Sequence, residues 1–331
     1  MEHRGLLALL LLAGAAGVGV LVAVAVGAFS TTHHKVVKVV VSSPNPKPTA
    51  STTTGGSSGG SPSSTGAPSS AVLRPGARAR FAQFAAGLPG RVEVAVAPLS
   101  DVRVVVLGSD TPAHGWSTTK IPVLAAVLLA RGSGGLTPAE QGWAQLAVTE
   151  SDNQSILNLF GDLESLEGGL AGASNYVQQL FRQSGDDQTV VATAPPPPGA
   201  VTTFGQTEWA PGQAVKFFRA FADGCLIPQS QTSYVLELMQ RIVPSESWGL
   251  GEASFGVPVA FKGGWGPEQS GYLVRQSGII DPGSKRGVAV SIVAYPPAGG
   301  DSFGVGTQMV TQTAQWLARE VVLHDAGGRI C

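Results

Sequence analysis

A change in composition after residue 71 limits which part of this 331-residue chain can form a folded core. Residues 5–29 carry no charged side chain and consist mostly of Leu, Ala, Val and Gly. Residues 30–71 are rich in Ser, Thr, Gly and Pro, so they bury too little apolar surface to offset the entropy lost on folding. Apolar and polar segments alternate through the remainder. We therefore expect one folded domain, over residues 72–331.

The apolar N-terminal segment predicts a helix that spans a membrane. At about 1.5 Å per residue, residues 5–29 are long enough to cross a hydrocarbon layer about 30 Å thick. The segment also exceeds the roughly 7–15 apolar residues of a secretory signal, although Val-Gly-Ala at 26–28 resembles a cleavage site. We expect residues 1–29 to be a transmembrane anchor or an uncleaved signal and residues 30–71 to be a disordered linker. The domain at 72–331 would then be extracytoplasmic, or secreted if the leader is cleaved.

Charge and cysteine content exclude several classes of function. The net charge is −1, which gives no electrostatic reason to expect a nucleic-acid partner. The chain has two cysteines, Cys225 and Cys331, and no C-x-x-C motif, so we expect no metal site and no other cofactor. The two cysteines either form a disulfide, as extracytoplasmic proteins allow, or remain unpaired thiols. We expect a monomer.

The hydrophobic pattern of the folded part predicts helices and strands in separate blocks. Helical spacing over 77–88 is followed by two β-branched segments, at 91–99 and 102–107, which form a hairpin around a turn at 100–101. Further helices are expected over 118–130, from 138, and over 153–160, 173–183, 211–221, 234–242 and 309–323, and further strands over 257–262, 272–280 and 287–295. Sequential hairpins predict an antiparallel sheet of about five strands, and helices must cover both of its faces. The predicted fold class is α/β, of the α+β type.

Three short motifs follow one another in this domain: Ser117-Thr118-Thr119-Lys120, Ser151-Asp152-Asn153 and Lys262-Gly263-Gly264. A serine hydroxyl is a poor nucleophile until a base takes its proton. Residues three apart on a helix share a face, so the Ser117 hydroxyl and the Lys120 amine are expected side by side. The apolar residues after Lys120 predict a buried helix, and burial favours a neutral lysine by lowering its pKa. The first motif therefore predicts a serine nucleophile with a lysine as its base.

Each motif alone has an ordinary structural explanation. S-x-x-K fits a helix cap followed by a surface lysine, S-D-N fits an N-cap, and Lys262 is expected to end a strand before a glycine turn. The folded domain contains only four lysines, however, and two of them, Lys120 and Lys262, fall in the motifs. The order of the three motifs favours a serine acyl-transfer site.

The motifs and the segments around them resemble class A β-lactamases and, more broadly, penicillin-recognising serine hydrolases. The resemblance covers most of residues 75–325 and implies a β-lactamase/transpeptidase-like fold with a helical subdomain. It implies that β-lactams or related amides and esters acylate Ser117, with Lys120 as the base and Ser151 as the relay of a proton to the leaving nitrogen. The partners would be a small-molecule β-lactam or a cell-wall peptide, together with the bacterial membrane that holds the N-terminal helix.

The resemblance also assigns residues that bind the substrate. Asn153 would contact its amide, and Lys262 would hold the relay serine and attract a substrate carboxylate. The backbone N–H groups of Ser117 and Trp265 would form the oxyanion hole, with Gly264 beside them.

Three departures from the family pattern weaken the expectation of fast β-lactam hydrolysis. Gly263 stands where the family usually has a hydroxyl residue, which removes a hydrogen bond to a substrate carboxylate. The interval from Ser117 to Ser151 is 34 residues (151 − 117), shorter than usual, so we expect a trimmed helical subdomain and a more open site. Residues 168–207 contain no glutamate to activate a deacylating water. Arg275 is the nearest basic residue on the next strand. It either assists carboxylate binding or lies on a solvated strand face, and we expect the solvated face.

Two other functions fit the same residues. The first is a D-alanyl-D-alanine carboxypeptidase or transpeptidase that acts on cell-wall peptides. The second is a non-catalytic cell-wall sensor on the same fold, which the missing glutamate favours. A Ser–His–Asp hydrolase is disfavoured, because the segment from Gly115 to Thr119 lacks the final glycine of the G-x-S-x-G elbow.

Overall fold

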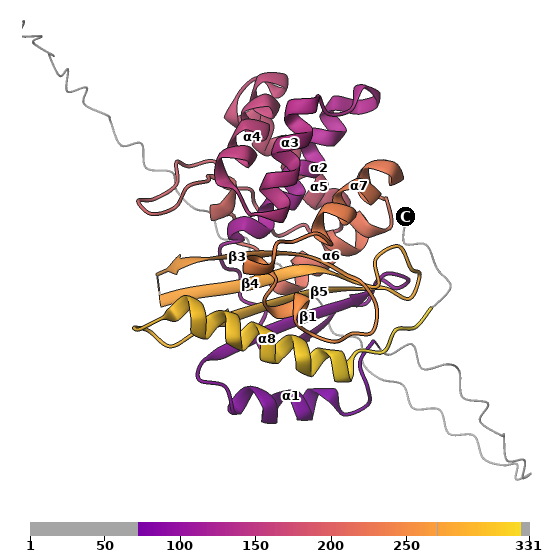
Figure 1. Ribbon diagram of the computed structural model, residues 1–331, viewed down its shortest axis with the longest axis vertical. Helices are drawn as coiled ribbons and strands as arrows, with labels where there is room; N and C mark the ends of the chain where they lie inside the picture. Colours follow the sequence, from indigo (N-terminus) through magenta and orange to yellow (C-terminus); the bar gives the residue numbers. More distant parts are fainter. Residues whose placement is uncertain (1–71, 270, 326–331) are drawn as a thin grey trace, which may run out of the picture. The chain divides into compact units, whose positions relative to one another are not determined.

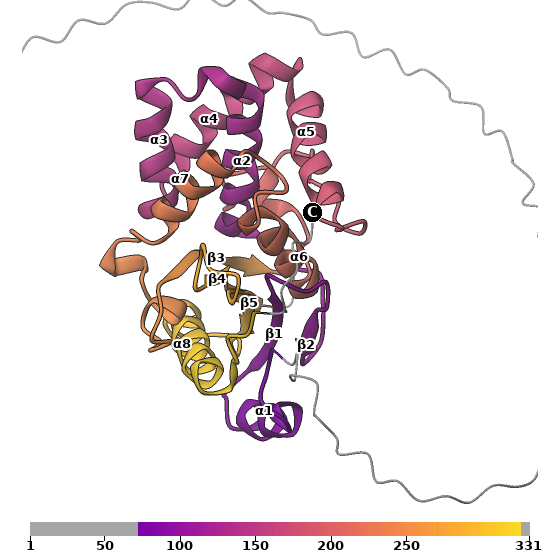
Figure 2. The same cartoon turned by 90° about the vertical axis from the view of Figure 1, so that its right-hand side faces the viewer.

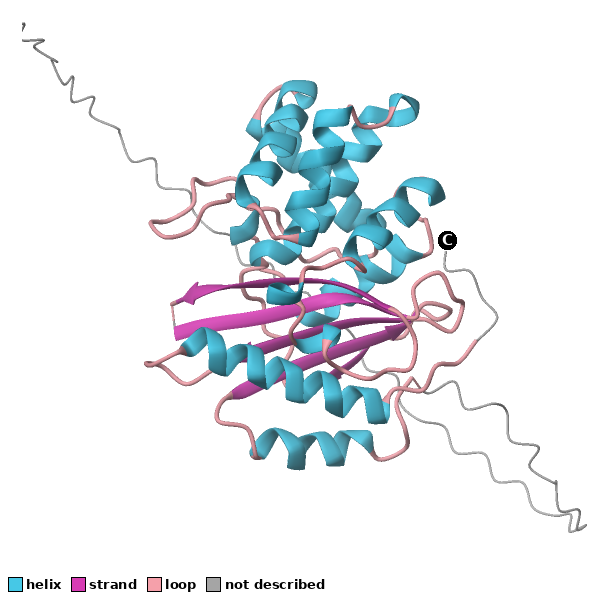
Figure 3. Cartoon of the chain, viewed as in Figure 1, coloured by secondary structure: helices cyan, strands magenta, loops and turns pink. Residues whose placement is uncertain are grey.

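The computed structural model describes residues 72–269 and 271–325, which form an antiparallel sheet of five strands with helices on both faces (Figure 1, Figure 3). The strands are β1 (Arg91–Pro98), β2 (Val105–Leu107), β3 (Val259–Glu268), β4 (Gly271–Ile280) and β5 (Val288–Tyr295). The helices are α1 (Ala77–Ala86), α2 (Lys120–Arg131), α3 (Pro138–Thr149), α4 (Asn153–Glu167), α5 (Leu170–Gln183), α6 (Pro211–Ala222), α7 (Gln229–Met239) and α8 (Ser302–Glu320). The predicted α+β architecture is confirmed.

Several predictions from the sequence concern residues that lie outside the described ranges. These are the anchor at 1–29, the linker at 30–71, and Cys331, one of the two cysteines for which the sequence leaves both a disulfide and unpaired thiols open. Within the part of the chain that the structure describes, no helix combines the length and the apolar character that crossing a bilayer requires. The anchor, the linker and the disulfide therefore stay predictions.

The sheet has the order β2-β1-β5-β4-β3, so β3 forms one of its edges. Strand β1 alternates between the two faces, as the two-residue period of a strand requires. Val94 and Val96 belong to the core under α1 and α8, whereas Ala95 and Ala97 belong to the core on the α6 side. The views in Figure 1 and Figure 2 show these helices on opposite faces. Because both faces are covered, the central strands are apolar along most of their length.

Helices α2 to α5 and α7 form a helical subdomain on the same side of the sheet as α6 (Figure 2). Helix α2 lies at its centre, since every residue from Ile121 to Leu128 is buried. A helix that is apolar on all sides has to be surrounded by protein. Helix α4 packs against α2 and α3, and its buried residues Ile156, Leu159 and Leu163 recur at helical spacing. This packing carries the first residue of α2, Lys120, into the protein interior.

Two expectations about the edge of the sheet are wrong. Strand β3 does not end at Lys262 but continues through both glycines, because β4 pairs with it along its whole length and places Gly264 opposite Arg275. Arg275 is fully buried and does not lie on a solvated face, because helices cover β4 on both sides. The third motif therefore lies within the edge strand β3 and is not a turn after it.

Candidate active site

The three motifs converge on one pocket, of about 260 Å³, where the edge strand β3 meets the helical subdomain. Its lining consists of Trp116, Ser117, Ser151, Asn153, Gly199, Val201, Thr202, Glu246, Trp265, Gly266, Pro267 and Tyr272. Four of the expected site residues thus line the pocket. The other three lie next to it: Lys120 and Lys262 are buried against Ser151, and Gly264 lies against the backbone of Ser117.

Ser117 lies on a tight 3₁₀ turn, η1 (Trp116–Thr119), directly before α2. The Thr118 hydroxyl donates to the Gly115 carbonyl at 2.5 Å, and the Thr119 hydroxyl donates to the Trp116 carbonyl at 2.5 Å. Trp116 has a φ of +47°, which side chains other than glycine rarely adopt. Such backbone strain persists only where the surroundings enforce it, and it is frequent at active sites. The turn therefore holds Ser117, the nucleophile that the motif predicts, in a fixed position.

Two glycines let β3 approach this turn closely. A Cβ atom at Gly264 would lie 2.8 Å from the Ser117 amide nitrogen and 3.0 Å from the Gly115 carbonyl oxygen. A Cβ atom at Gly266 would overlap the ring of Trp116. The strand therefore lies against the backbone amide of the nucleophile, immediately before Trp265. This is where the sequence places the oxyanion hole.

Lys120 is fully buried, and its amine meets the second motif. Its Nζ donates to the Ser151 carbonyl at 2.5 Å and to the Asp152 carbonyl at 3.3 Å, and it lies 3.5 Å from Ser151 Oγ. Burial lowers the pKa of Lys120 to about 6, and the charge of Lys262 lowers it as well. With a pKa of about 6 the amine is mostly neutral at pH 7, so it can accept a proton.

The described residues include no hydrogen bond between the Lys120 amine and the Ser117 hydroxyl. The two groups are three residues apart at the start of one helix, as predicted. Catalytic hydrogen bonds commonly tighten only when the substrate is bound, so this geometry is compatible with proton transfer.

Ser151 connects the two buried lysines. It has a φ of +58° and precedes Asp152, the N-cap of α4, whose carboxylate accepts a hydrogen bond from the Ser155 amide at 2.6 Å. Lys262 Nζ donates to Ser151 Oγ at 2.8 Å. Asn153 begins α4 and lines the pocket. The second motif is therefore a helix cap, as its composition suggests, and also the link between the first and third motifs.

Glu246 is a residue of the pocket that the sequence reasoning missed. It lies on a short 3₁₀ turn, η4 (Pro244–Glu246), between α7 and β3. Its Oε2 atom lies 3.9 Å from Lys262 Nζ, and it is the one carboxylate among the described residues that line the pocket. Burial raises the pKa of Glu246, an effect that Lys262 opposes; burial lowers the pKa of Lys262 to about 8, an effect that Glu246 opposes. No motif marks Glu246, because its position depends on how the chain folds between α7 and β3.

The loop between α5 and α6 reaches the pocket with Val201 and Thr202. None of its acidic residues, Asp186, Asp187 and Glu208, lines the pocket. Asp186 is buried elsewhere, where it accepts hydrogen bonds from the Thr189 amide at 2.9 Å and from the Trp209 indole at 3.2 Å. In the described structure this loop supplies no acid to the pocket, and the part of it up to residue 207 contains no glutamate.

Arg275 lies behind the site. Its Nη1 atom donates to the carbonyl oxygens of Ala113 and His114, both at 3.2 Å, and of Trp209 at 3.0 Å, whereas Nε and Nη2 have no hydrogen-bond partner among the described residues. These bonds attach β4 to the segment that leads into η1. Arg275 therefore supports the turn that carries the nucleophile.

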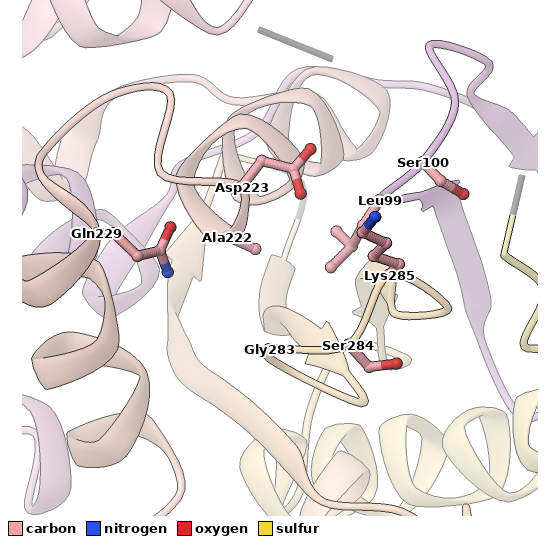
Figure 4. A pocket seen from close by; sticks show the side chains of 8 residues that line it. All are labelled: Leu99, Ser100, Ala222, Asp223, Gln229, Gly283, Ser284 and Lys285. Atoms are coloured by element: carbon pink, nitrogen blue, oxygen red, sulfur yellow. The ribbon is translucent and has the colours of Figure 1, made fainter. Parts of the chain in front are cut away.

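A second hollow, of about 270 Å³, lies where the end of β1 and the β4–β5 turn face α6 (Figure 4). Its lining consists of Leu99, Ser100, Ala222, Asp223, Gln229, Gly283, Ser284 and Lys285. None of the three motifs contributes to it. The pocket at Ser117 is therefore the candidate active site.

No protein-family model matches the chain, and no curated protein sequence matches it. Several solved structures share its fold. The β-lactamase from Streptosporangium roseum has a TM-score of 0.57 and 17% identity, over 73% of this chain and 97% of that one. The chromosome-encoded β-lactamase of Vibrio parahaemolyticus has a TM-score of 0.57 and 17% identity, over 73% of this chain and 98% of that one. PBP-A has a TM-score of 0.54 and 18% identity, over 73% of this chain and 96% of that one. At this identity the likeness concerns the fold, and the chain has the β-lactamase/transpeptidase-like fold that the motifs predicted.

Proposed function

We propose that this protein is a serine hydrolase or acyl transferase that forms a covalent acyl-enzyme at Ser117. The observation that carries the proposal is the buried chain of contacts from Lys120 to Ser151 to Lys262, next to a pocket lined by Ser117. Ser117 Oγ attacks the substrate carbonyl, and the Lys120 amine takes its proton. The carbon–nitrogen or carbon–oxygen bond then breaks as Ser151 passes a proton to the leaving atom. Lys262 orients the Ser151 hydroxyl for this transfer.

The substrate-binding roles belong to the same proposal. The backbone N–H groups of Ser117 and Trp265 stabilise the oxyanion, and Gly264 permits the close approach of strand and turn that this needs. Asn153, which lines the pocket beside Ser151, binds the amide of the substrate.

The chemical class of the substrate is an amide or ester. The solved structures that share the fold are titled β-lactamases and PBP-A, which supports a β-lactam or a cell-wall peptide. The loop between α5 and α6 supplies no acid to the pocket, so we expect acylation to be faster than deacylation. An acyl-enzyme that persists favours, as a second candidate, a D-alanyl-D-alanine carboxypeptidase or transpeptidase over a fast β-lactamase.

We also propose that the domain works outside the cytoplasmic membrane as a monomer. The uncharged segment at 5–29 and the Ser/Thr/Gly/Pro-rich stretch at 30–71 support a single-pass anchor followed by a tether. Membrane fractionation of the full-length chain tests this placement.

The adduct on Ser117 is the direct test of the proposed function. We expect intact-protein mass spectrometry to show a stoichiometric adduct after incubation with a panel of β-lactams and activated esters or thioesters. We expect peptide fragmentation to place it on Ser117. Protein unfolded before incubation is the control, because the reaction depends on the folded contacts of Lys120. If no member of the panel modifies Ser117, a non-catalytic sensor is the better description.

The rate of acylation should depend on pH through the two buried lysines. Lys120 acts as a base only when neutral, so below its pKa of about 6 the rate should fall about tenfold per pH unit. The pKa of Lys262 is about 8, and loss of its charge above that value should weaken the orientation of Ser151 and lower the rate again. Single-turnover rates from about pH 5 to about pH 9 check both limbs. A rate that still rises steeply above pH 8 would indicate that the pKa of Lys120 is close to the ordinary lysine value of 10.5.

A further inference from the structure

The hydrogen-bonding capacity of the Lys262 ammonium is used inside the protein. Its Nζ donates to Ser151 Oγ at 2.8 Å and to the Gly263 carbonyl at 3.1 Å. The Glu246 carboxylate forms an ion pair with this ammonium, with its Oε2 atom 3.9 Å away. The Lys262 side chain is only 1% exposed. Little of this cation is therefore left for an anion that enters the pocket.

No other group in the described pocket replaces this cation. The pocket lining includes neither lysine nor arginine. The Lys120 amine faces two backbone carbonyls, and Arg275 is fully buried and does not line the pocket. The residue after Lys262 is Gly263, which offers no hydroxyl. A carboxylate bound here would meet the carboxylate of Glu246 without a free cation to compensate.

One part of the pocket lining carries aromatic side chains and a proline. Trp116, Trp265 and Tyr272 line it together with Pro267. The Trp116 indole donates to Glu268 at 3.1 Å, and the ring of Trp265 packs on Phe303 at 5.0 Å between centroids, so these rings are held in place. Such a wall binds uncharged groups well.

We propose that this site selects acyl donors that carry no carboxylate near the scissile bond, and that Glu246 is the residue that excludes the carboxylate. The proposal rests on the proposed function. It differs from what the sequence resemblance implies for Lys262, namely attraction of a substrate carboxylate. The preferred substrates are uncharged esters, thioesters or amides with an apolar group beside the scissile bond.

A matched pair of substrates tests the proposal. The first is a phenylacetylglycyl thioester whose leaving thiol carries a carboxylate, and the second is the methyl ester of that carboxylate. In both reactions the bond from Ser117 Oγ to the carbonyl carbon forms, the carbon–sulfur bond breaks, and the serine proton leaves with the thiol. The ratio of the two acylation rates cancels every step that the substrates share. We expect the wild type to favour the methyl ester by about tenfold or more.

Removing the charge of Glu246 should change this ratio. We expect Glu246→Gln, which keeps the shape of the side chain, to shift the ratio toward the carboxylate by about tenfold. Glu252→Gln removes the same charge from an exposed residue outside the pocket and should leave the ratio unchanged. In the wild type alone, added salt should also shift the ratio toward the carboxylate, because salt screens like-charge repulsion.

Two results would overturn the proposal while leaving the acyl-enzyme intact: a wild type that prefers the carboxylate, or a ratio that neither Glu246→Gln nor salt changes. If neither substrate nor any β-lactam modifies Ser117, the proposed function fails and this inference fails with it. The salt dependence gives an answer even if the Glu246→Gln variant does not fold.

Discussion

Replacing Lys120 with methionine should lower the rate constant for acylation of Ser117 by about 10³-fold, within the range that a general base contributes. The reason is local. Lys120 is the first residue of α2, one helical turn from the nucleophile, and burial together with the Lys262 charge lowers its pKa to about 6. At neutral pH its amine therefore has a free lone pair, whereas Lys262, with a pKa of about 8, keeps its proton. Methionine fills a similar volume but accepts no proton.

The stability of the Lys120→Met variant separates a catalytic effect from misfolding. The folded pKa of Lys120, about 6, lies below the unfolded value of 10.5, so the unfolded chain binds more protons between these pH values. The wild type is thus destabilised at pH 7 by the need to discharge this lysine, and its stability rises with pH through that window. The variant loses this cost, so we expect its melting temperature at pH 7 to rise. Full-rate acylation by a folded Lys120→Met variant would contradict the base assignment.

The sequence predicts much of the fold because its local signals agree with one another. The Thr-Pro-x-Glu start of α3 forms the expected capping box, in which Thr137 and Glu140 bond reciprocally. The apolar segment after Ser117 forms the buried helix α2, and the hairpin of β1 and β2 pairs Val94 with Leu107. Each of these features depends on residues close together in the chain, so their spacing is enough to predict them.

The predictions that the structure contradicts, and the site residue that the sequence did not indicate, concern side chains whose contacts come from distant segments of the chain. Two glycines after Lys262 suggest a turn, but pairing with β4 keeps them extended. Arg275 looks like a surface residue, yet it is fully buried and its Nη1 atom donates to three backbone carbonyls from two other segments. Glu246 carries no motif, and only the packing of η4 against the site brings it near Lys262. A spacing rule for one element contains no information about these contacts.

A single methyl group at Gly264 tests how closely strand β3 approaches Ser117. We expect Gly264→Ala to lower the acylation rate by about 10²-fold, the size of loss that a displacement of about 1 Å produces in an active site. The new Cβ atom would lie 2.8 Å from the Ser117 nitrogen and 3.0 Å from both the Gly115 oxygen and the Thr118 nitrogen. All three neighbours are backbone atoms, so β3 and η1 have to move apart.

Gly142→Ala is the matched control, because Gly142 is an exposed residue inside α3 with no atom within 4 Å of its added Cβ atom. It should leave acylation unchanged and raise the melting temperature slightly, since alanine favours a helix interior by up to about 1 kcal/mol. Gly264→Ala should instead lose about 1–3 kcal/mol through overpacking. Thermal unfolding and single-turnover acylation of the two variants give both quantities. Full-rate acylation by Gly264→Ala would mean that β3 does not approach the nucleophile this closely, and the oxyanion hole would then have to be built from other donors.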